Sequence, residues 1–226
     1  MQPNNRGQLF IVATPIGNLA DLSSRAIATL KASDLICAED TRVTGGLLSK
    51  FDLKVKMMTV QQHSDDSVLN DVIDQLKSGK SISVVTDAGT PNISDPGGQL
   101  VARAVAEGIS IIPIPGPSAL IAALSISGFA ADNFTFLGFP PHKKGRETYF
   151  RNLALIEHTI VLYEATHRIE KTLAQLPPDR LLVVCRELTK LHETTYRGLA
   201  AEVIAELEQG SKKGEFVIVV APIGWK

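Results

Sequence analysis

Several features that mark specialised protein classes are scarce or absent in this sequence. It contains only 2 cysteines and 5 histidines, and the histidines show no metal-ligand spacing. Neither a disulfide framework nor a metal centre is therefore expected. No apolar run reaches the roughly 18 residues of a membrane helix, and the first residues lack the pattern of a secretion signal. These absences predict a cytoplasmic protein with no metal site and no membrane contact.

An excess of charge of one sign is also lacking. The formal net charge is −1, from 23 basic and 24 acidic side chains. Affinity for a nucleic acid rises with the number of phosphates that a protein neutralises, and neither half of this chain is basic enough to bind by bulk charge. Any contact with a nucleic acid must therefore use a few cationic side chains in a local patch.

The glycine-rich signatures of nucleotide binding are missing as well. The phosphate loop needs GxxxxGK[ST], and the dinucleotide turn needs GxGxxG after the first strand. The first expected strand is instead followed by TPIGN at 14–18, which has one glycine, and no lysine is placed to neutralise a phosphate. A ligand that binds mainly through its phosphates is therefore disfavoured.

What the sequence does contain is a regular alternation of short apolar strands and amphipathic helices, typical of a mostly parallel sheet covered on both faces. One helix is expected to be capped by Asp95, with Pro96 at its first position. The pattern resets near 128–133, which predicts an α/β fold of two α/β domains, residues 1–128 and 129–226. Strands are expected at 9–14, 34–39, 55–60, 81–86, 109–114, 134–139, 158–164, 180–187 and 215–222.

The stretch VTDAGTPNISDPGG at 84–97 is the first candidate site, because ligands of open α/β sheets bind beyond the carboxyl ends of the strands. The loop opens with Asp87, whose carboxylate would repel phosphate. A carboxylate beside bare backbone suits a ligand with cationic and hydroxyl groups and a flat ring. S-adenosylmethionine fits that description, although Asp87 is equally open to the interpretation that it caps a turn.

Other strand ends carry candidate groups with an equally ordinary alternative. EDTR at 39–42 offers two carboxylates and a guanidinium, or simply an ion pair between Asp40 and Arg42. In PGPSA, Ser118 either meets a ligand or caps a helix. YEATHR at 163–168 and RELTKLHE at 186–193 are functional loops or solvated helix starts, and KKGR at 143–146 is a basic cluster or a solvated loop.

Taken in order, these segments resemble one family. TPIGNLAD, EDTR, DAGTPNISDPG, PGPSA, YEATHR, RELTK and GEFVIVV together are similar to the tetrapyrrole (corrin/porphyrin) methylase superfamily. Within it they resemble the ribosomal RNA small subunit methyltransferase I group, the 2′-O-ribose methyltransferases of bacterial 16S rRNA. The resemblance covers nearly all of residues 8–222.

The resemblance implies two α/β domains with S-adenosylmethionine in the cleft between them, a homodimer, and methylation of one cytidine ribose in the decoding region of the small ribosomal subunit. Carried over position by position, it implies a set of cofactor-binding residues in both domains. These are Pro15, Ile16, Asp87, Thr90, Ile93, Ser118, Ala119, Tyr163, Ala221 and Pro222.

Methyl transfer to a ribose hydroxyl is an in-line displacement that needs alignment and is helped by a nearby acceptor for the hydroxyl proton. The candidate acceptors are the strand-end carboxylates Glu39, Asp40 and Glu187, and positioning without any base is an alternative. A second set of residues shares a cationic side chain suited to RNA phosphates. These are Arg42, Lys143, Lys144, Arg146, Arg186 and Lys190.

Two departures from the group's pattern keep other functions open. Val43 stands where the group usually has histidine, and His63-Ser64-Asp65 replaces the usual His-Asn-Glu. These departures give weight to a cofactor-binding RNA chaperone without turnover, and a tetrapyrrole methyltransferase is a second alternative to an rRNA methyltransferase.

Overall fold

The computed structural model describes residues 7–62 and 64–225. The chain folds as two compact units, Met1–Ser118 and Ala119–Lys226. The division precedes the boundary expected between 128 and 129, and helix α5 (Ala119–Ser127) accounts for the difference. This helix packs on strands of the second unit, and the Leu120 N–H donates a hydrogen bond of 3.2 Å to the Tyr163 hydroxyl there.

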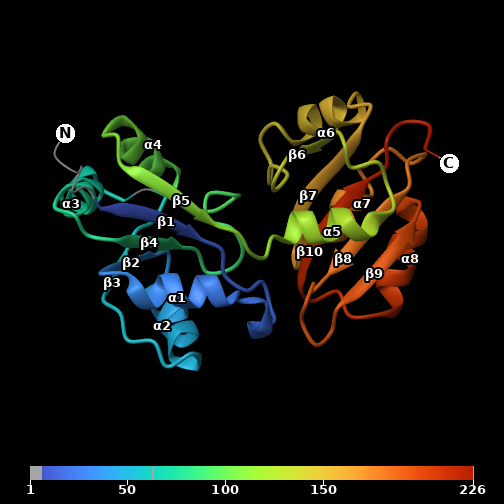
Figure 1. Ribbon diagram of the computed structural model, residues 1–226. Helices are drawn as coiled ribbons and strands as arrows, with labels where there is room; N and C mark the ends of the chain where they lie inside the picture. The colour runs from blue at the N-terminus through green and yellow to red at the C-terminus, as the bar shows by residue number, and fades with distance from the viewer. Residues whose placement is uncertain (1–6, 63, 226) are drawn as a thin grey trace. The chain divides into compact units, whose positions relative to one another are not determined.

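The first unit contains a five-stranded parallel sheet with the order β3-β2-β4-β1-β5 (Figure 1). Each strand overlaps a segment expected from the sequence, so a parallel α/β sheet is confirmed for this unit. The strands are β1 (Gln8–Val12), β2 (Leu35–Ala38), β3 (Met57–Thr59), β4 (Ile82–Val85) and β5 (Ser110–Ile114).

Helices cover both faces of this sheet. On one face, α3 (Asp66–Lys77) and α4 (Gly98–Ala106) pack Val72 and Leu100 against strand residues such as Cys37. On the other face, α1 (Ser24–Ala32) and α2 (Thr41–Lys50) pack on the neighbouring strand positions, including Ile36. Successive strand residues point to opposite faces, so burial on both faces explains why the strands are apolar throughout.

The start of helix α4 differs from the sequence prediction. Its cap is Gly97, with φ of 129° and no side-chain cap bond, so the prediction of a cap by Asp95 with Pro96 in the first turn is wrong. The preceding loop turns back on itself, because Asn92 and Ser94 have φ of 72° and 64°. The Asn92 N–H donates to the Pro96 carbonyl at 3.3 Å. Asp95 therefore belongs to a compact loop rather than to the helix.

The second unit contains a mixed sheet with the order β6-β7-β10-β8-β9. Only β6 and β7 are parallel, because β10 runs antiparallel to both of its neighbours and β9 runs antiparallel to β8. The mostly parallel arrangement therefore holds for the first unit alone. The strands are β6 (Phe134–Phe136), β7 (Thr159–Ala165), β8 (Leu182–Arg186), β9 (Thr194–Gly198) and β10 (Glu215–Val220).

Three helices of the second unit contribute to one apolar cluster, and a fourth helix packs on the strands of the sheet. α6 (Arg146–Ala154), α7 (Ile169–Leu173) and α8 (Ala200–Gln209) contribute residues such as Phe150 and Val203 to a cluster with Ile218. α5 packs on β7, β8 and β10. Strand β9 was not expected from the sequence, since TTYRG is a short polar segment in which only Tyr196 is buried. None of the helices in the described ranges is long and apolar enough to cross a membrane.

Candidate functional site

Three loops meet at the carboxyl edge of the first sheet. The loops after β1 and β4 form a two-way backbone bridge: the Thr14 N–H donates to the Gly89 carbonyl at 2.9 Å, and the Gly89 N–H donates to the Thr14 carbonyl at 3.1 Å. The Thr90 hydroxyl donates to the Pro117 carbonyl at 3.0 Å, which adds the loop after β5. The carboxyl ends of parallel strands share one edge, so loops distant in sequence come together there.

This bridge requires glycine at position 89. Gly89 has φ of 87°, and a Cβ atom built there would lie 3.4 Å from Cγ2 of Ile16. The expected cofactor residues Pro15, Ile16 and Thr90 are therefore brought to one place in the first unit. Ile93 lies on the exposed turn after Thr90, where its N–H donates to the Thr90 carbonyl at 3.3 Å.

Carboxylates from two strand ends join the same edge. Glu39 Oε2 accepts a hydrogen bond of 2.7 Å from the Thr86 hydroxyl and a longer one of 3.4 Å from the Asp87 N–H. Asp87 Oδ1 in turn accepts from the Asp40 N–H at 3.2 Å. The structure thus assembles Glu39, Asp40 and Asp87 as the sequence suggested, and leaves the Asp87 side chain at the surface.

Asp95 joins this group, although its place before Pro96 in the sequence indicated only a capping role. Burial raises the pKa of Asp95 from 3.8 to about 6, and the negative charge of Glu39 adds to the effect despite a hydrogen bond with Thr86. Burial, and after it Glu39, also raises the pKa of Asp87. The signal in the sequence was the second aspartate of the stretch DAGTPNISDPG, which follows the same strand end.

A small hollow lies beside Asp95. Its volume is about 150 Å³, and it is lined by residues that follow β3, by the loop after β4 and by the start of α4, among them Gln61, Asn92 and Gly98. His63, next to one wall of this hollow in sequence, lies outside the described residues. Asp95 therefore combines partial burial, a raised pKa and access to a hollow at the sheet edge.

Asp40 and Arg42 form the ion pair that is the ordinary interpretation of the EDTR segment. Asp40 Oδ1 accepts from the Arg42 N–H at 2.8 Å and caps helix α2, while the Arg42 Nη2 lies 2.6 Å from Asp40 Oδ2. The hydrogen bonds from Arg42 lower the pKa of Asp40 to about 2. A carboxyl with so low a pKa is a weak proton acceptor at neutral pH. Arg42 itself remains 89% exposed and can still contact a substrate.

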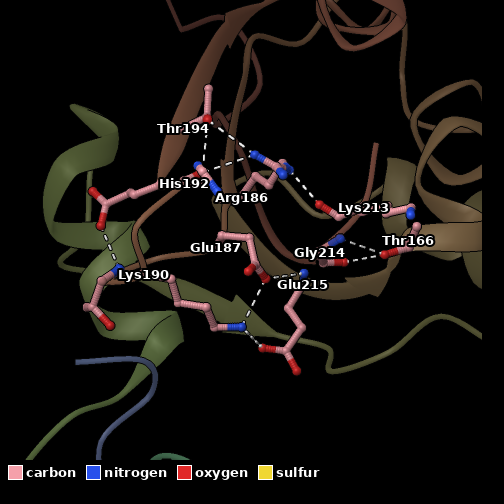
Figure 2. Close-up of polar contacts among 11 residues, drawn as sticks. Thr166, Arg186, Glu187, Lys190, His192, Thr194, Lys213, Gly214 and Glu215 are labelled. Atoms are coloured by element: carbon pink, nitrogen blue, oxygen red, sulfur yellow. Dashed lines mark hydrogen bonds and ion pairs between the residues drawn. The ribbon is translucent and has the colours of Figure 1, made fainter. Parts of the chain in front are cut away.

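In the second unit, Arg186 holds the loop that follows β8 (Figure 2). Its Nε donates to the Lys213 carbonyl at 2.7 Å, and its Nη1 donates to the His192 carbonyl at 3.0 Å and to Thr194 Oγ1 at 3.4 Å. The residue is buried, with 7% of its surface exposed. Because the guanidinium is directed at the protein's own backbone, this placement argues against the expected contact of Arg186 with an RNA phosphate.

Glu187 and Lys190 form a second network in the same loop (Figure 2). The Lys190 ammonium contacts Glu187 Oε1 at 2.9 Å and Glu215 Oε2 at 2.7 Å, and Glu187 Oε1 also accepts from the Glu215 N–H at 2.9 Å. Burial alone would raise the pKa of Glu187, but the hydrogen bonds from Lys190 and Glu215 outweigh it and lower the pKa. Burial would lower the pKa of Lys190, and the two carboxylates raise it.

These contacts leave Glu187 poorly suited to be a general base. The backbone supports the same interpretation of a constrained structural loop, since Glu187 and Thr189 have φ of 53° and 66°. Non-glycine residues with such angles persist only where the surrounding contacts hold them.

The basic cluster at 143–146 divides into two kinds of residue. Lys143 and Lys144 are exposed. Arg146 is 5% exposed and donates to Gln175 Oε1 at 2.7 Å, to the Pro141 carbonyl at 2.8 Å and to the Thr172 hydroxyl at 2.7 Å. Arg146 is therefore committed within the unit, which argues against its expected role as a direct phosphate ligand.

Three of the remaining candidates of the second unit lie apart along strand β10. Tyr163 on β7 is the register partner of Val217, whereas Ala221 and Pro222 follow the far end of β10. The Ala221 N–H donates to the Leu181 carbonyl at 2.9 Å, and its carbonyl accepts from Arg180 Nε at 2.6 Å. The antiparallel direction of β10 accounts for this separation, since its carboxyl end lies at the opposite edge from that of β7.

Comparison with known proteins decides the family. A family model described as Tetrapyrrole (Corrin/Porphyrin) Methylases matches residues 8–204. The chain belongs to this family.

Within the described residues, no group of three or more histidine, cysteine, aspartate or glutamate side chains has a metal-binding arrangement.

Curated members of the family include closely similar sequences. Ribosomal RNA small subunit methyltransferase I of Synechocystis sp. is 46% identical over 95% of this chain and 79% of its own length. The protein of the same name from Xylella fastidiosa is 47% identical over 95% of this chain and 81% of its own length. The one from Halalkalibacterium halodurans is 42% identical over 100% of this chain and 79% of its own length.

Solved structures agree on the fold. A cobalt precorrin-4 methyltransferase, a cobalamin biosynthetic enzyme, superimposes with a TM-score of 0.69 at 17% identity, covering 98% of this chain and 97% of its own. A uroporphyrin-III-C-methyltransferase from Thermus thermophilus gives 0.65 at 19% identity, covering 96% and 94%. At these identities the likeness concerns the fold alone.

Proposed function

We propose that this methylase transfers a methyl group from S-adenosylmethionine to the 2′-hydroxyl of a cytidine ribose in the decoding region of 16S rRNA. The observation that carries the proposal is the similarity, over nearly the whole chain, to proteins named ribosomal RNA small subunit methyltransferase I. A homodimer remains a prediction of the same likeness.

The carboxyl edge of the first sheet fits the chemistry of this methyl donor, which carries a sulfonium and an ammonium group, a ribose and an adenine but no phosphate. Asp87 presents an exposed carboxylate there, with Glu39 and Asp95 behind it. The nearby guanidinium of Arg42 is already paired with Asp40. A surface with this charge favours a cationic ligand and disfavours a dinucleotide.

The donor, when bound, supplies an electrophilic methyl group, and the protein must align the ribose hydroxyl and receive its proton. Among the carboxylates described above, Asp95 has a pKa of about 6, close to the operating pH that favours general-base catalysis. Asp40 and Glu187 have lowered pKa values. We therefore propose Asp95 as the proton acceptor and Asp87 as a cofactor contact.

Two other functions have specific support and remain testable. A tetrapyrrole methyltransferase is supported by the description of the family, Tetrapyrrole (Corrin/Porphyrin) Methylases. An RNA chaperone that binds the cofactor without turnover is suggested by Val43, which is exposed on helix α2 where the group's pattern has histidine.

One transfer experiment separates these functions. Labelled S-adenosylmethionine is supplied with small subunits from cells that lack the gene, with free 16S rRNA, or with uroporphyrinogen. We expect label in the RNA of the subunits, at a cytidine 2′-oxygen. Label in uroporphyrinogen alone would establish the tetrapyrrole activity, and cofactor binding without any transfer would establish the chaperone.

Two variants test the residue roles. Asp87→Ala should weaken S-adenosylmethionine binding in calorimetry while the fold persists. Asp95→Asn should bind the cofactor normally but lose roughly 10²–10⁴-fold in transfer rate, the usual contribution of a general base. In the unmodified protein the rate should fall as pH decreases through about 6, because the Asp95 carboxyl is then protonated. A rate independent of pH between 5 and 8 would exclude this role.

A further inference from the structure

The loop between β6 and α6, residues 137–145, presents cationic side chains at one surface of the second unit. Lys143 and Lys144 are exposed, and among the described residues neither ammonium group makes an ion pair. The ring of His142 stacks on that of His167, with centroids 6.3 Å apart and an interplanar angle of 26°. Both histidines are exposed as well, so this surface carries two lysine ammonium groups and two imidazole rings.

Two arginines, the buried Arg146 and the partly buried Arg168, fix the backbone of this loop. The Arg146 guanidinium donates to the Pro141 carbonyl at 2.8 Å, and the Arg168 guanidinium donates to the Pro140 carbonyl at 3.0 Å. Hydrogen bonds from charged donors are about twice as strong as neutral ones. Consecutive carbonyls of the loop are thus each fixed by a charged donor.

Both arginines connect to one buried carboxylate. Glu164, whose side chain is fully buried, contacts Arg168 Nη2 at 2.6 Å through Oε1 and accepts from the Thr172 hydroxyl at 2.5 Å through Oε2. Thr172 in turn accepts from Arg146 Nη2 at 2.7 Å. The network therefore runs from Glu164 to both loop carbonyls.

We propose that residues 142–144 and His167 form a preorganised binding surface for the phosphate backbone of the RNA substrate, positioned by the Glu164–Thr172–Arg146 and Glu164–Arg168 contacts. The proposal rests on the proposed RNA methyltransferase function. Lys143 and Lys144 contact phosphates, whereas Arg146, Arg168, Glu164 and Thr172 are positioning residues.

The physical reason lies in the overall charge of the chain. With a formal net charge of −1, the protein cannot gain affinity from many phosphate contacts and depends on a few. A few contacts suffice only when little conformational entropy is lost on binding, and a loop fixed by charged hydrogen bonds meets that condition. The ring nitrogens of His142 and His167 add hydrogen-bond donors beside the lysines.

The first test removes the two exposed lysines. The variant Lys143→Ala/Lys144→Ala should raise the KM for small subunits roughly tenfold or more and reduce the slope of log affinity against log salt by about 2, since each phosphate contact contributes about 1. The affinity for S-adenosylmethionine and kcat should stay unchanged. The matched control is Lys31→Ala/Lys50→Ala, which removes two exposed lysines from helices α1 and α2.

The outcomes separate this proposal from the proposed function. If the unmodified protein methylates no RNA, the proposed function fails. If it methylates small subunits and the Lys143→Ala/Lys144→Ala variant retains its KM and salt slope, the phosphate surface is wrong. An equal loss in both double variants would show a general charge effect and would also overturn the proposal.

The second test concerns the positioning network. Thr172→Val keeps the side-chain volume but removes the hydroxyl that joins Glu164 to Arg146. Thr172→Ser keeps that hydroxyl. Thr172→Val should raise the KM for RNA several-fold with little change in kcat, and trypsin should cleave faster after Lys143 and Lys144. Thr172→Ser should show the KM for RNA and the trypsin cleavage rate of the unmodified protein. Faster cleavage with an unchanged KM would mean that the network serves stability alone, against the proposal.

Discussion

Arg186 offers the sharpest separation between a structural and a substrate-binding role. The residue is 7% exposed and makes two short hydrogen bonds from its guanidinium to the Lys213 and His192 carbonyls, at 2.7 and 3.0 Å. Hydrogen bonds to charged groups contribute about 1.5–3 kcal/mol each. Replacement by methionine also removes the cost of burying a charge, so the lower value of about 1.5 kcal/mol applies to each of the two hydrogen bonds. The free energy of unfolding should therefore fall by about 3 kcal/mol.

For a chain of this size, each kcal/mol lowers Tm by about 2–4 °C, so Arg186→Met should melt about 6–12 °C below the unmodified protein. The matched control is Lys213→Met, which removes a positive charge from the segment between α8 and β10 that Arg186 contacts while keeping the backbone carbonyl that accepts its hydrogen bond. Circular dichroism melts of the three proteins provide the measurement. An Arg186→Met variant with the same Tm as the control but a raised KM for RNA would refute the structural interpretation. It would support instead the contact of Arg186 with an RNA phosphate.

Three further outcomes follow from the structure. Because burial raises the pKa of Asp95 from 3.8 to about 6, the folded protein binds its proton more tightly than the unfolded chain, and stability is lost as pH rises through this window. Asp95→Asn should therefore melt higher than the unmodified protein at pH 7 and match it near pH 4; equal melting at pH 7 would contradict the raised pKa. Gly214→Ala should lose about 2 kcal/mol in urea unfolding, since Gly214 has φ of 136° and a Cβ would lie 2.6 Å from Cγ of Glu187. Gly210→Ala, where the nearest atom would be 3.7 Å away, is the control that should unfold almost normally. Burial raises the pKa of Cys37 to about 12, so a thiol reagent should label it only as the protein unfolds, and rapid labelling of the native protein would contradict its burial.

Local pattern determined most of the secondary structure. In the first unit, strands such as Leu35–Ala38 are apolar at every position because both faces are covered, and this continuous signal is hard to mistake. The strand Thr194–Gly198 escaped prediction because it lies at the sheet edge with four of its five residues not buried. The helix expected to start at Pro96 begins at Gly98, because loop contacts such as that of Asn92 with Pro96 outweigh the local preference of proline for a first turn.

The sequence by itself also determined the family, since motifs spread over nearly the whole chain agree in order, and it placed Glu39, Asp40 and Asp87 after strands of the first sheet. Only the tertiary structure decided what individual charges do. Lys143 and Arg146 are three residues apart and both basic, yet one is exposed and the other is buried against Thr172. Likewise Asp40 and Asp95 are the same residue type, but Arg42 lowers the pKa of one to about 2 while burial raises that of the other to about 6. The reason is that burial and the partners of a polar atom are set by segments distant in sequence, which no local pattern encodes.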